Sequence, residues 1–308
     1  MRLDLAVSRR FGLSRRAARE AVRAGRVDVG GVPRNEPGTE VAEEADLSHH
    51  PDRPARRSVR TSLSVLHEDA DLIVVDKPAG LLTVPTAERE KDTLLSRVSL
   101  YLQHRYRRRP YVGVVHRIDR ETSGAVVFVR TREALRFLQQ RFRSHEIERE
   151  YLAIVEGEPA DSGSFDAALT GDGVARRRAV ARPGERGKRA VTRYRVLERL
   201  PGASLVSIEL ETGRTHQIRI HFAASGHPVV GDRVYRHPGA PPPPIEASRQ
   251  MLHARRLGLP HPRGSGFVRV ESPIPDDFAK TVAALRRTRQ KKAPRIGRGA
   301  REREKTRG

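Results

Sequence analysis

Short apolar runs, each closed by polar turn-forming residues, recur across residues 63–285 and limit the folds open to this chain. Apolar runs of about four to eight residues bounded by turn signals are typical of strands. We expect helices at about 131–142 and 215–226, because Thr131 and Thr215 are suitable N-caps. The expected strands cover 72–75, 125–129, 151–155, 190–197 and 205–210. Strands dominate and the helices are interspersed irregularly, so the sequence predicts an α+β fold with a mixed, largely antiparallel sheet.

The first 47 residues form a compact pattern of their own. Ser14 is a good N-cap, and Gly25 a good terminating residue, for a helix across Arg15–Ala24. The segment RVDVGGVPR that follows predicts a short β-hairpin with the Gly-Gly pair in its turn. We therefore expect a small domain built from a helix and a hairpin.

Three arginines of this helix, Arg15, Arg19 and Arg23, recur every four residues and so line one stripe of its surface. Such a stripe can contact backbone phosphates, but it can equally be an ordinary solvated face. The residues alone do not decide between the two.

Composition divides the chain into four parts. We expect a small domain over 1–47, a Pro- and Arg-rich linker over 48–62 and a main domain over 63–285. The last part, 286–308, has 11 Lys and Arg against two Glu and almost no apolar residues. Because such a segment cannot bury enough surface to fold, we expect a disordered, nucleic-acid-binding tail.

A basic surplus points to the class of partner. The chain has 60 Lys and Arg against 38 Asp and Glu, a formal net charge of +22. Neutralised phosphates release counterions, so this charge favours a nucleic acid. A convincing helix-turn-helix is missing from the pattern, which argues against a DNA-binding regulator.

The residue inventory excludes several chemistries. There is no cysteine, and therefore no disulfide scaffold, Cys-based zinc site or thiol nucleophile. His216 and His221 lie five residues apart, which places them on different helix faces and argues against a metal pair. The sequence contains no G-x-S-x-G elbow and no phosphate-binding glycine loop. We expect neither a metal nor a cofactor.

No apolar run approaches the ~20 residues that cross a bilayer, and the first ten residues carry no apolar signal segment. We expect a cytoplasmic monomer without a membrane partner.

Two polar clusters interrupt the strand pattern. The first is HRIDRETSG at 116–124, in which Asp119 lies between Arg117 and Arg120, whose charges would keep it ionised. A solvated loop between strands would also be polar, so the composition of this segment does not by itself prove a site. The second is ETGRTHQIRIH at 211–221, where Arg214 precedes the expected helix and could pair with a carboxylate or a phosphate.

The small domain and the main domain each resemble a known family of proteins that act on RNA. Residues 2–47, with LSRRAAREAVRAGRVDVGG, resemble an S4-type RNA-binding module. The main domain resembles the RluA-type pseudouridine synthases through four ordered motifs, VVDKPAGLLTVP at 74–85, HRIDRETSG at 116–124, REYLAIVEG at 149–157 and ETGRTHQIRIHFAASGHPVVGD at 211–232. The resemblance extends over nearly all of 63–285.

The resemblance implies a role for individual residues. Asp119 matches the family's essential aspartate, which acts on the ribose side as the glycosidic bond breaks. Tyr151 matches the tyrosine that lies against the target base, and Arg214 the arginine that pairs with the aspartate. Arg117 matches the side chain that enters the RNA stack when the uridine flips out. The Lys77-Pro78 motif is expected to be structural.

The implied reaction detaches uracil and rejoins it through C5, which is redox-neutral and needs no cofactor. The sequence leaves open whether Asp119 adds covalently or supports a glycal route. The S4-like module favours large-subunit ribosomal RNA as the substrate, with tRNA as an alternative. Arg120 and the three helix arginines are further candidates for RNA contact. A non-catalytic ribosome-assembly factor with the same fold is the competing hypothesis.

Overall fold

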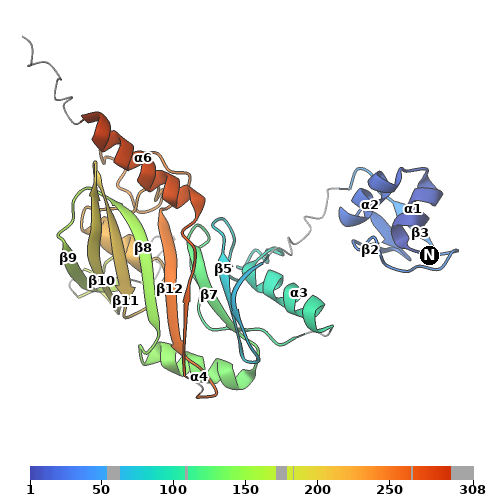
Figure 1. Cartoon of the computed structure of the whole chain (residues 1–308), viewed down its shortest axis with the longest axis horizontal. Coiled ribbons are helices and arrows are strands. Elements are labelled where there is room, and N and C mark those ends of the chain that lie inside the picture. Colours follow the sequence, from blue (N-terminus) through green and yellow to red (C-terminus); the bar gives the residue numbers. More distant parts are fainter. Residues whose placement is uncertain (54–62, 108–109, 171–178, 183, 265, 293–308) are drawn as a thin grey trace, which may run out of the picture. The chain divides into compact units, whose positions relative to one another are not determined.

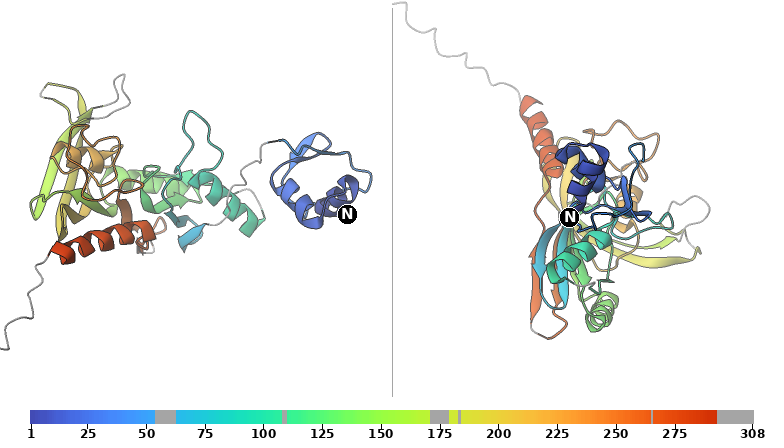
Figure 2. Two further views of the ribbon diagram at one scale, coloured as in Figure 1. Left: turned by 90° about the horizontal axis from the view of Figure 1, so that it is seen from above. Right: turned by 90° about the vertical axis from the view of Figure 1, so that its right-hand side faces the viewer.

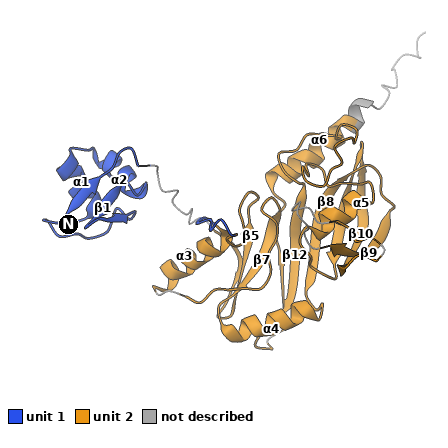
Figure 3. Cartoon of the chain, turned by 180° about the vertical axis from the view of Figure 1, so that it is seen from behind, with its two compact units in different colours: residues 1–62, 87–92 blue, residues 63–86, 93–308 orange. Residues whose placement is uncertain are grey.

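The computed structural model describes residues 1–53, 63–107, 110–170, 179–182, 184–264 and 266–292. Contacts divide the chain into two compact units, one of residues 1–62 and 87–92 and the other of residues 63–86 and 93–308 (Figure 3).

The first unit contains two short helices and a three-stranded sheet (Figure 1). Ser14 caps the second helix as predicted, since its Oγ accepts a hydrogen bond of 3.2 Å from the Ala17 amide. The Gly-Gly turn of the hairpin is also confirmed, because both glycines adopt the positive φ that such a turn requires. The elements are α1 (Leu3–Phe11), α2 (Arg15–Arg23), β1 (Val27–Val29), β2 (Val32–Arg34) and β3 (Leu47–His49), with the strands in the order β2-β1-β3.

The ordered part of this unit extends into the expected linker over 48–62. Strand β3 pairs with β1 as far as His49. The guanidinium of Arg53 makes two hydrogen bonds to the carboxylate of Asp28, one of them of 2.7 Å from Nη2. The expected start of the linker is therefore wrong, because a strand and an ion pair hold these residues. Residues 54–62 lie outside the described residues.

The second unit contains one large sheet. Its strands are β4 (Ser64–Glu68), β5 (Leu72–Lys77), β6 (Gly113–Val114), β7 (Ser123–Val129), β8 (Glu148–Glu156), β9 (Ser162–Thr170), β10 (Gly187–Leu200), β11 (Ala203–Leu210), β12 (Leu252–Pro260) and β13 (Phe267–Glu271). Its helices are α3 (Leu94–Tyr106), α4 (Arg132–Arg143), α5 (Gln217–Ala224) and α6 (Asp276–Lys292).

The main path of the sheet runs β4-β5-β7-β12-β8-β11-β10-β9, with β13 on β12 and β6 on β7. Of the pairings between these described strands, β7 with β12 is parallel and the others are antiparallel. The predicted mixed, largely antiparallel sheet of an α+β fold is confirmed.

Helices cover both faces of the central strands. Within Leu72–Val75 of β5, odd-numbered side chains pack in the same cluster as α3 and α5, and even-numbered ones pack with α4. On β8, Tyr151 shares the first of these faces, whereas Leu152 and Ile154 pack against α6. Figure 2 shows α6 lying along one side of the sheet. Burial on both faces explains why these strands read as continuous apolar runs rather than as alternating ones.

Two expected boundaries differ from the structure. Helix α5 begins at Gln217 and ends at Ala224, and its N-cap is His216 in the left-handed conformation, not Thr215. Helix α6 continues to Lys292, so the expected disorder over 286–308 is wrong for its first seven residues. There the guanidinium of Arg286 binds the carboxylate of Glu198. Residues 293–308 lie outside the described residues.

No helix in the described ranges has the length and apolarity that a membrane span requires.

Candidate active site

A buried lysine anchors the loop that carries Asp119. Lys77, at the end of β5, is fully buried, and burial lowers its pKa to about 7. Its Nζ donates to three main-chain carbonyls, those of Pro78 at 2.9 Å, Leu81 at 2.6 Å and Arg120 at 2.8 Å. The lysine thus ties the turn after β5 to the residue that follows Asp119, which is the structural role expected for this motif.

A threonine completes this anchor. The Thr83 hydroxyl donates to the Ile118 carbonyl at 2.9 Å and accepts from the Ile118 amide at 3.3 Å. Contacts on both sides of Asp119 therefore fix its backbone, so that the carboxylate can be held at one position.

The carboxylate of Asp119 faces α5. Its Oδ2 accepts a hydrogen bond of 3.1 Å from Nη1 of Arg219, and its Oδ1 lies 3.8 Å from Nε2 of His216. The sequence predicts that Arg117 and Arg120 supply the positive charge around Asp119. This prediction is wrong for the direct ion pair, which Asp119 makes with Arg219. Arg117 is exposed and donates to the Thr215 hydroxyl at 3.4 Å. Helix α5 provides the charge because it brings a residue 100 positions away against the loop.

A second carboxylate orients Arg219. The buried Asp232 accepts from Nε of Arg219 at 2.6 Å and from Nη2 at 3.0 Å, which leaves Nη1 for Asp119. Burial alone would lower the pKa of Arg219, but the hydrogen bonds to Asp232 and Asp119 outweigh it and raise that pKa. Asp232, Arg219 and Asp119 thus form a line of contacts from the core to the pocket.

The predicted pairing of Arg214 with Asp119 is wrong. Nε of Arg214 donates to the Arg189 carbonyl at 3.1 Å, and the side chain is exposed. The buried Gln217 fixes the turn before α5, since its Oε1 accepts from the Arg214 amide at 2.9 Å and from the Thr212 hydroxyl at 2.8 Å. This turn directs Arg214 along the pocket rim and leaves the aspartate to Arg219.

Tyr151 lies on β8, opposite Ile208 of β11 and Ala254 of β12. Its side chain is only 8% exposed and belongs to the apolar core, yet it also lines the pocket. Burial raises the pKa of its phenol, so Tyr151 is neutral at neutral pH. It presents a flat aromatic ring with a protonated hydroxyl at the pocket wall.

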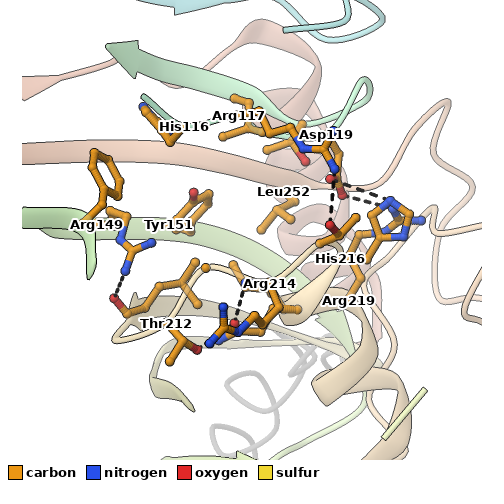
Figure 4. A pocket seen from close by; sticks show the side chains of 18 of the residues that line it. His116, Arg117, Asp119, Arg149, Tyr151, Thr212, Arg214, His216, Arg219 and Leu252 are labelled. Atoms are coloured by element: carbon orange, nitrogen blue, oxygen red, sulfur yellow. Dashed lines mark hydrogen bonds and ion pairs between the residues drawn. The ribbon is translucent and has the colours of Figure 1, made fainter. Parts of the chain in front are cut away.

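These side chains meet in one pocket of about 440 Å³ (Figure 4). Four of the candidate site residues predicted from the sequence line it, namely Arg117, Asp119, Tyr151 and Arg214. Asp119 is the one carboxylate among the described lining residues, and it faces a mainly basic surround. The geometry can hold a planar polar molecule between a carboxylate and an aromatic ring.

His116 is also part of this pocket. Its Nε2 accepts a hydrogen bond of 3.1 Å from the Val127 amide, and its ring stacks on Phe142 with centroids 5.1 Å apart. Burial lowers the pKa of His116 to about 3, so the ring is neutral at physiological pH.

Sequence reasoning named neither Arg219 nor Asp232 as a site residue. A usable signal was present, because Arg219 stands between Ile218 and Ile220 in a buried helix, where an arginine needs an anionic partner.

Side chains that could bind a metal gather elsewhere in the described part of the second unit. The ligand atoms of Asp69, Asp71 and His261 lie within 4.8 Å of one another. Asp71 is already ion-paired with Arg263, and Asp69 lies 2.6 Å from His67. These carboxylates therefore have protein partners, and they do not line the Asp119 pocket.

Comparisons with known proteins show which family the chain resembles. The sequence profile of the RNA pseudouridylate synthase family matches residues 71–224, and that of the S4 domain matches residues 1–47. A Pseudomonas aeruginosa protein named ribosomal large subunit pseudouridine synthase D is 39% identical over 237 residues, which cover 74% of this chain and 73% of that protein.

A Mycobacterium bovis protein described as an uncharacterized RNA pseudouridine synthase is 33% identical over 93% of this chain and 94% of its own length. The structure of human RNA pseudouridylate synthase domain containing 4 has the same fold, with a TM-score of 0.61 at 23% identity over 72% of this chain and 93% of that chain. The resemblance seen in the motifs is thereby confirmed, and the chain belongs to the RNA pseudouridylate synthase family, as an RNA pseudouridine synthase that carries an S4 domain.

Proposed function

We propose that this enzyme converts specific uridines of large-subunit ribosomal RNA to pseudouridine. The observation that supports it best is the pocket in which the Asp119 carboxylate, ion-paired to Arg219, shares a wall with the buried phenol of Tyr151. The name of the Pseudomonas aeruginosa relative, which is similar over most of both chains, supports the ribosomal target.

In this proposal Asp119 acts on the sugar while the C1′–N1 bond breaks, and Tyr151 lies against the uracil. The base then turns and bonds to C1′ through C5. The route on the sugar side is either covalent addition of the carboxylate or proton loss to a glycal. Both routes are redox-neutral and use only side chains, in line with the expectation that no cofactor is needed.

The target nucleotide has to leave the RNA stack to reach this pocket. We propose that Arg117, exposed at the pocket entrance, fills the space that the uridine leaves, and that Arg120 and Arg214 contact the RNA beside it. On α2, Arg15 and Arg23 are exposed and available to phosphates.

Arg19, the third arginine of the α2 stripe, also binds Asp4 at 3.2 Å.

We propose that the enzyme acts as a monomer in the cytoplasm.

Incubation of unmodified large-subunit rRNA and, separately, tRNA transcripts with wild-type enzyme and with Asp119→Ala tests the proposal. Carbodiimide labelling and reverse-transcriptase stops then map pseudouridine. We expect new stops in rRNA with wild type only, while Asp119→Ala still binds the RNA. Stops in tRNA alone would reassign the substrate. Full activity of Asp119→Ala would refute the role of Asp119, and tight binding without stops would favour an assembly factor.

A further inference from the structure

Five arginines line the pocket, and one of them differs from the rest in its electrostatic surroundings. Arg219 is neutralised by Asp119 and Asp232. Three others, Arg117, Arg143 and Arg214, are exposed to solvent. Arg149 alone among these is half-buried and has no carboxylate partner among the described residues. A partly desolvated cation without a counterion is costly, and such charges concentrate at functional sites.

The guanidinium of Arg149 is held in place by neutral groups. Its Nη2 donates to the carbonyls of Leu210 at 3.0 Å and Glu211 at 2.9 Å, and the group lies 5.5 Å from the ring centroid of Phe142. Its Nε is buried and has no hydrogen-bond partner in the described ranges. Burial lowers the pKa of Arg149 from its usual value, which reflects the desolvation. The positive charge is therefore fixed but not compensated.

The second guanidinium nitrogen, Nη1, lies directly over Gly213. A Cβ at that position would come within 2.6 Å of Nη1. The glycine thus leaves room for the guanidinium at the pocket surface, because any larger side chain would displace it.

Arg149 faces the same side of β8 as Tyr151, since residues two apart on a strand share a face. Both line the pocket with Asp119, and Figure 4 shows Tyr151 between Arg149 and Asp119. If the sugar lies at Asp119 and the base against Tyr151, the far edge of the base points toward Arg149.

The reaction of the family creates negative charge at that edge. When the C1′–N1 bond breaks, its electron pair stays on N1 and is delocalised onto the uracil oxygens O2 and O4. The sugar is left electron-deficient and is quenched by Asp119, either by a C1′–O bond or by transfer of a ribose proton. Later C1′ bonds to C5, the C5 proton is lost and N1 gains a proton, so that atoms and charge balance.

We propose that Arg149 is a catalytic residue that donates a hydrogen bond to O2 or O4 and stabilises the detached uracil as an anion. The fixed guanidinium acts as a preorganised donor at the site where charge develops. The inference rests on the family's reaction and is independent of which RNA is the target.

Arg149→Met keeps an unbranched, flexible side chain and removes the charge. Under single turnover, on the RNA that the wild-type enzyme converts, we expect a ~100-fold slower reaction with RNA affinity changed less than about threefold. Arg149→Lys should lose less, because it retains a cation. The melting temperature of each variant, compared with that of the wild type, reports on folding.

A fluorinated substrate separates this role from a structural one. One 5-fluorouridine at the target position makes the departing base a more stable anion, so its cleavage needs less help from the enzyme. On this substrate we expect Arg149→Met to slow the reaction by about tenfold or less, with the rate measured from the consumption of 5-fluorouridine. An equal loss on both substrates would overturn the proposal and assign Arg149 to holding the carbonyls of Leu210 and Glu211.

Gly213→Ala provides a second, independent test of the position of the guanidinium. It keeps Arg149 but displaces its guanidinium, so the proposal expects the same selective loss on uridine over 5-fluorouridine. Unchanged rates in Gly213→Ala, with the same RNA affinity and melting temperature, would contradict a requirement for the guanidinium at this place.

Discussion

At the scale of single residues, the position of Asp119 depends on a contact that ends in the core. Asp232 holds Arg219 through two hydrogen bonds, and Arg219 holds Asp119 through one. The buried aspartate touches no substrate in this arrangement, so it is a positioning residue.

Asp232→Asn should weaken both turnover and folding. Removing one member of a buried ion pair leaves the charge of Arg219 undercompensated, and we expect a loss of about 3 kcal/mol in the free energy of unfolding. Turnover should fall more than RNA affinity, because the uncoupled Arg219 no longer fixes Asp119. Urea denaturation and single-turnover rates measure the two effects. The control is Asp166→Asn, in an exposed pair with Arg189, which should change little.

His116 makes stability sensitive to acid. Its pKa is about 3 in the folded chain against a usual value of 6.5, so the unfolded chain binds more protons between these values. The contribution of His116 to stability is therefore fully present above about pH 6.5 and is lost as pH falls toward 3. His221 and His253, with lowered pKa values from burial, act in the same direction. Urea midpoints at several pH values test this, and His116→Gln should reduce the decline. An unaltered pH profile in that variant would contradict the assignment.

At the scale of elements, the site is built where two loops are joined rather than within one strand. Lys77 donates to two carbonyls of the turn after β5 and to one carbonyl of the loop before β7, and so joins the two segments. Helix α5 lies on the other side of Asp119 and contacts it through Arg219. Local sequence explains each element separately. Their joint position depends on hydrogen bonds between segments far apart in sequence, as between Lys77 and Arg120, which are 43 residues apart.

Lys77→Met should separate these loops. The substitution preserves volume but removes the Lys77 hydrogen bonds to the carbonyls of Pro78 and Leu81, the second of them buried, while the Arg120 carbonyl keeps the Gly80 amide as a donor. Each buried group left unsatisfied costs about 1–3 kcal/mol. We expect about 1–3 kcal/mol of lost stability and reduced turnover, read from denaturant midpoints and single-turnover assays. Lys280→Met, on the exposed face of α6, is the control and should leave both quantities near wild type. Equal behaviour of the two variants would show that the anchor is dispensable.

At the scale of the whole molecule, the excess of positive charge lies mostly in the second unit, since residues 1–62 and 87–92 hold 15 Lys and Arg against 12 Asp and Glu. Arg15 and Arg23 on α2 are exposed, as are Arg9 and Arg10 on α1. If the stripe on α2 contacts RNA phosphates, its charges contribute to the salt dependence of binding.

The double variant Arg15→Gln/Arg23→Gln in the full chain should weaken RNA binding and reduce the slope of log affinity against log salt by about 1.5, since each lost phosphate contact contributes ~0.7–0.9. Conversion at saturating enzyme should be unaffected, because the pocket is intact. Arg9→Gln/Arg10→Gln makes the same charge change on α1 and should leave the slope closer to wild type. Identical slopes for both variants would assign the stripe to an ordinary solvated face.

Local chemistry predicted much of this protein. The caps at Ser14 and Thr131, the Gly-Gly turn and the buried strands follow from short-range preferences, and the structure confirms them. Asp119 and Tyr151 were identified through motifs, because each lies in a contiguous segment whose pattern resembles the family.

By itself the sequence determined the α+β class, the family and several elements, among them α2, α4, β5 and β7, but not α3, α6 or β12. Only the tertiary structure decided which arginine meets Asp119. Neighbours in sequence suggested Arg117 and Arg120, and the family resemblance suggested Arg214, but an ion pair depends on distance in space. Packing of α5 brings Arg219 to the loop, and Asp232 fixes its direction. The uncompensated charge of Arg149 is likewise a property of three-dimensional surroundings, since its burial and the absence of a carboxylate partner among the described residues are set only when the strands pair.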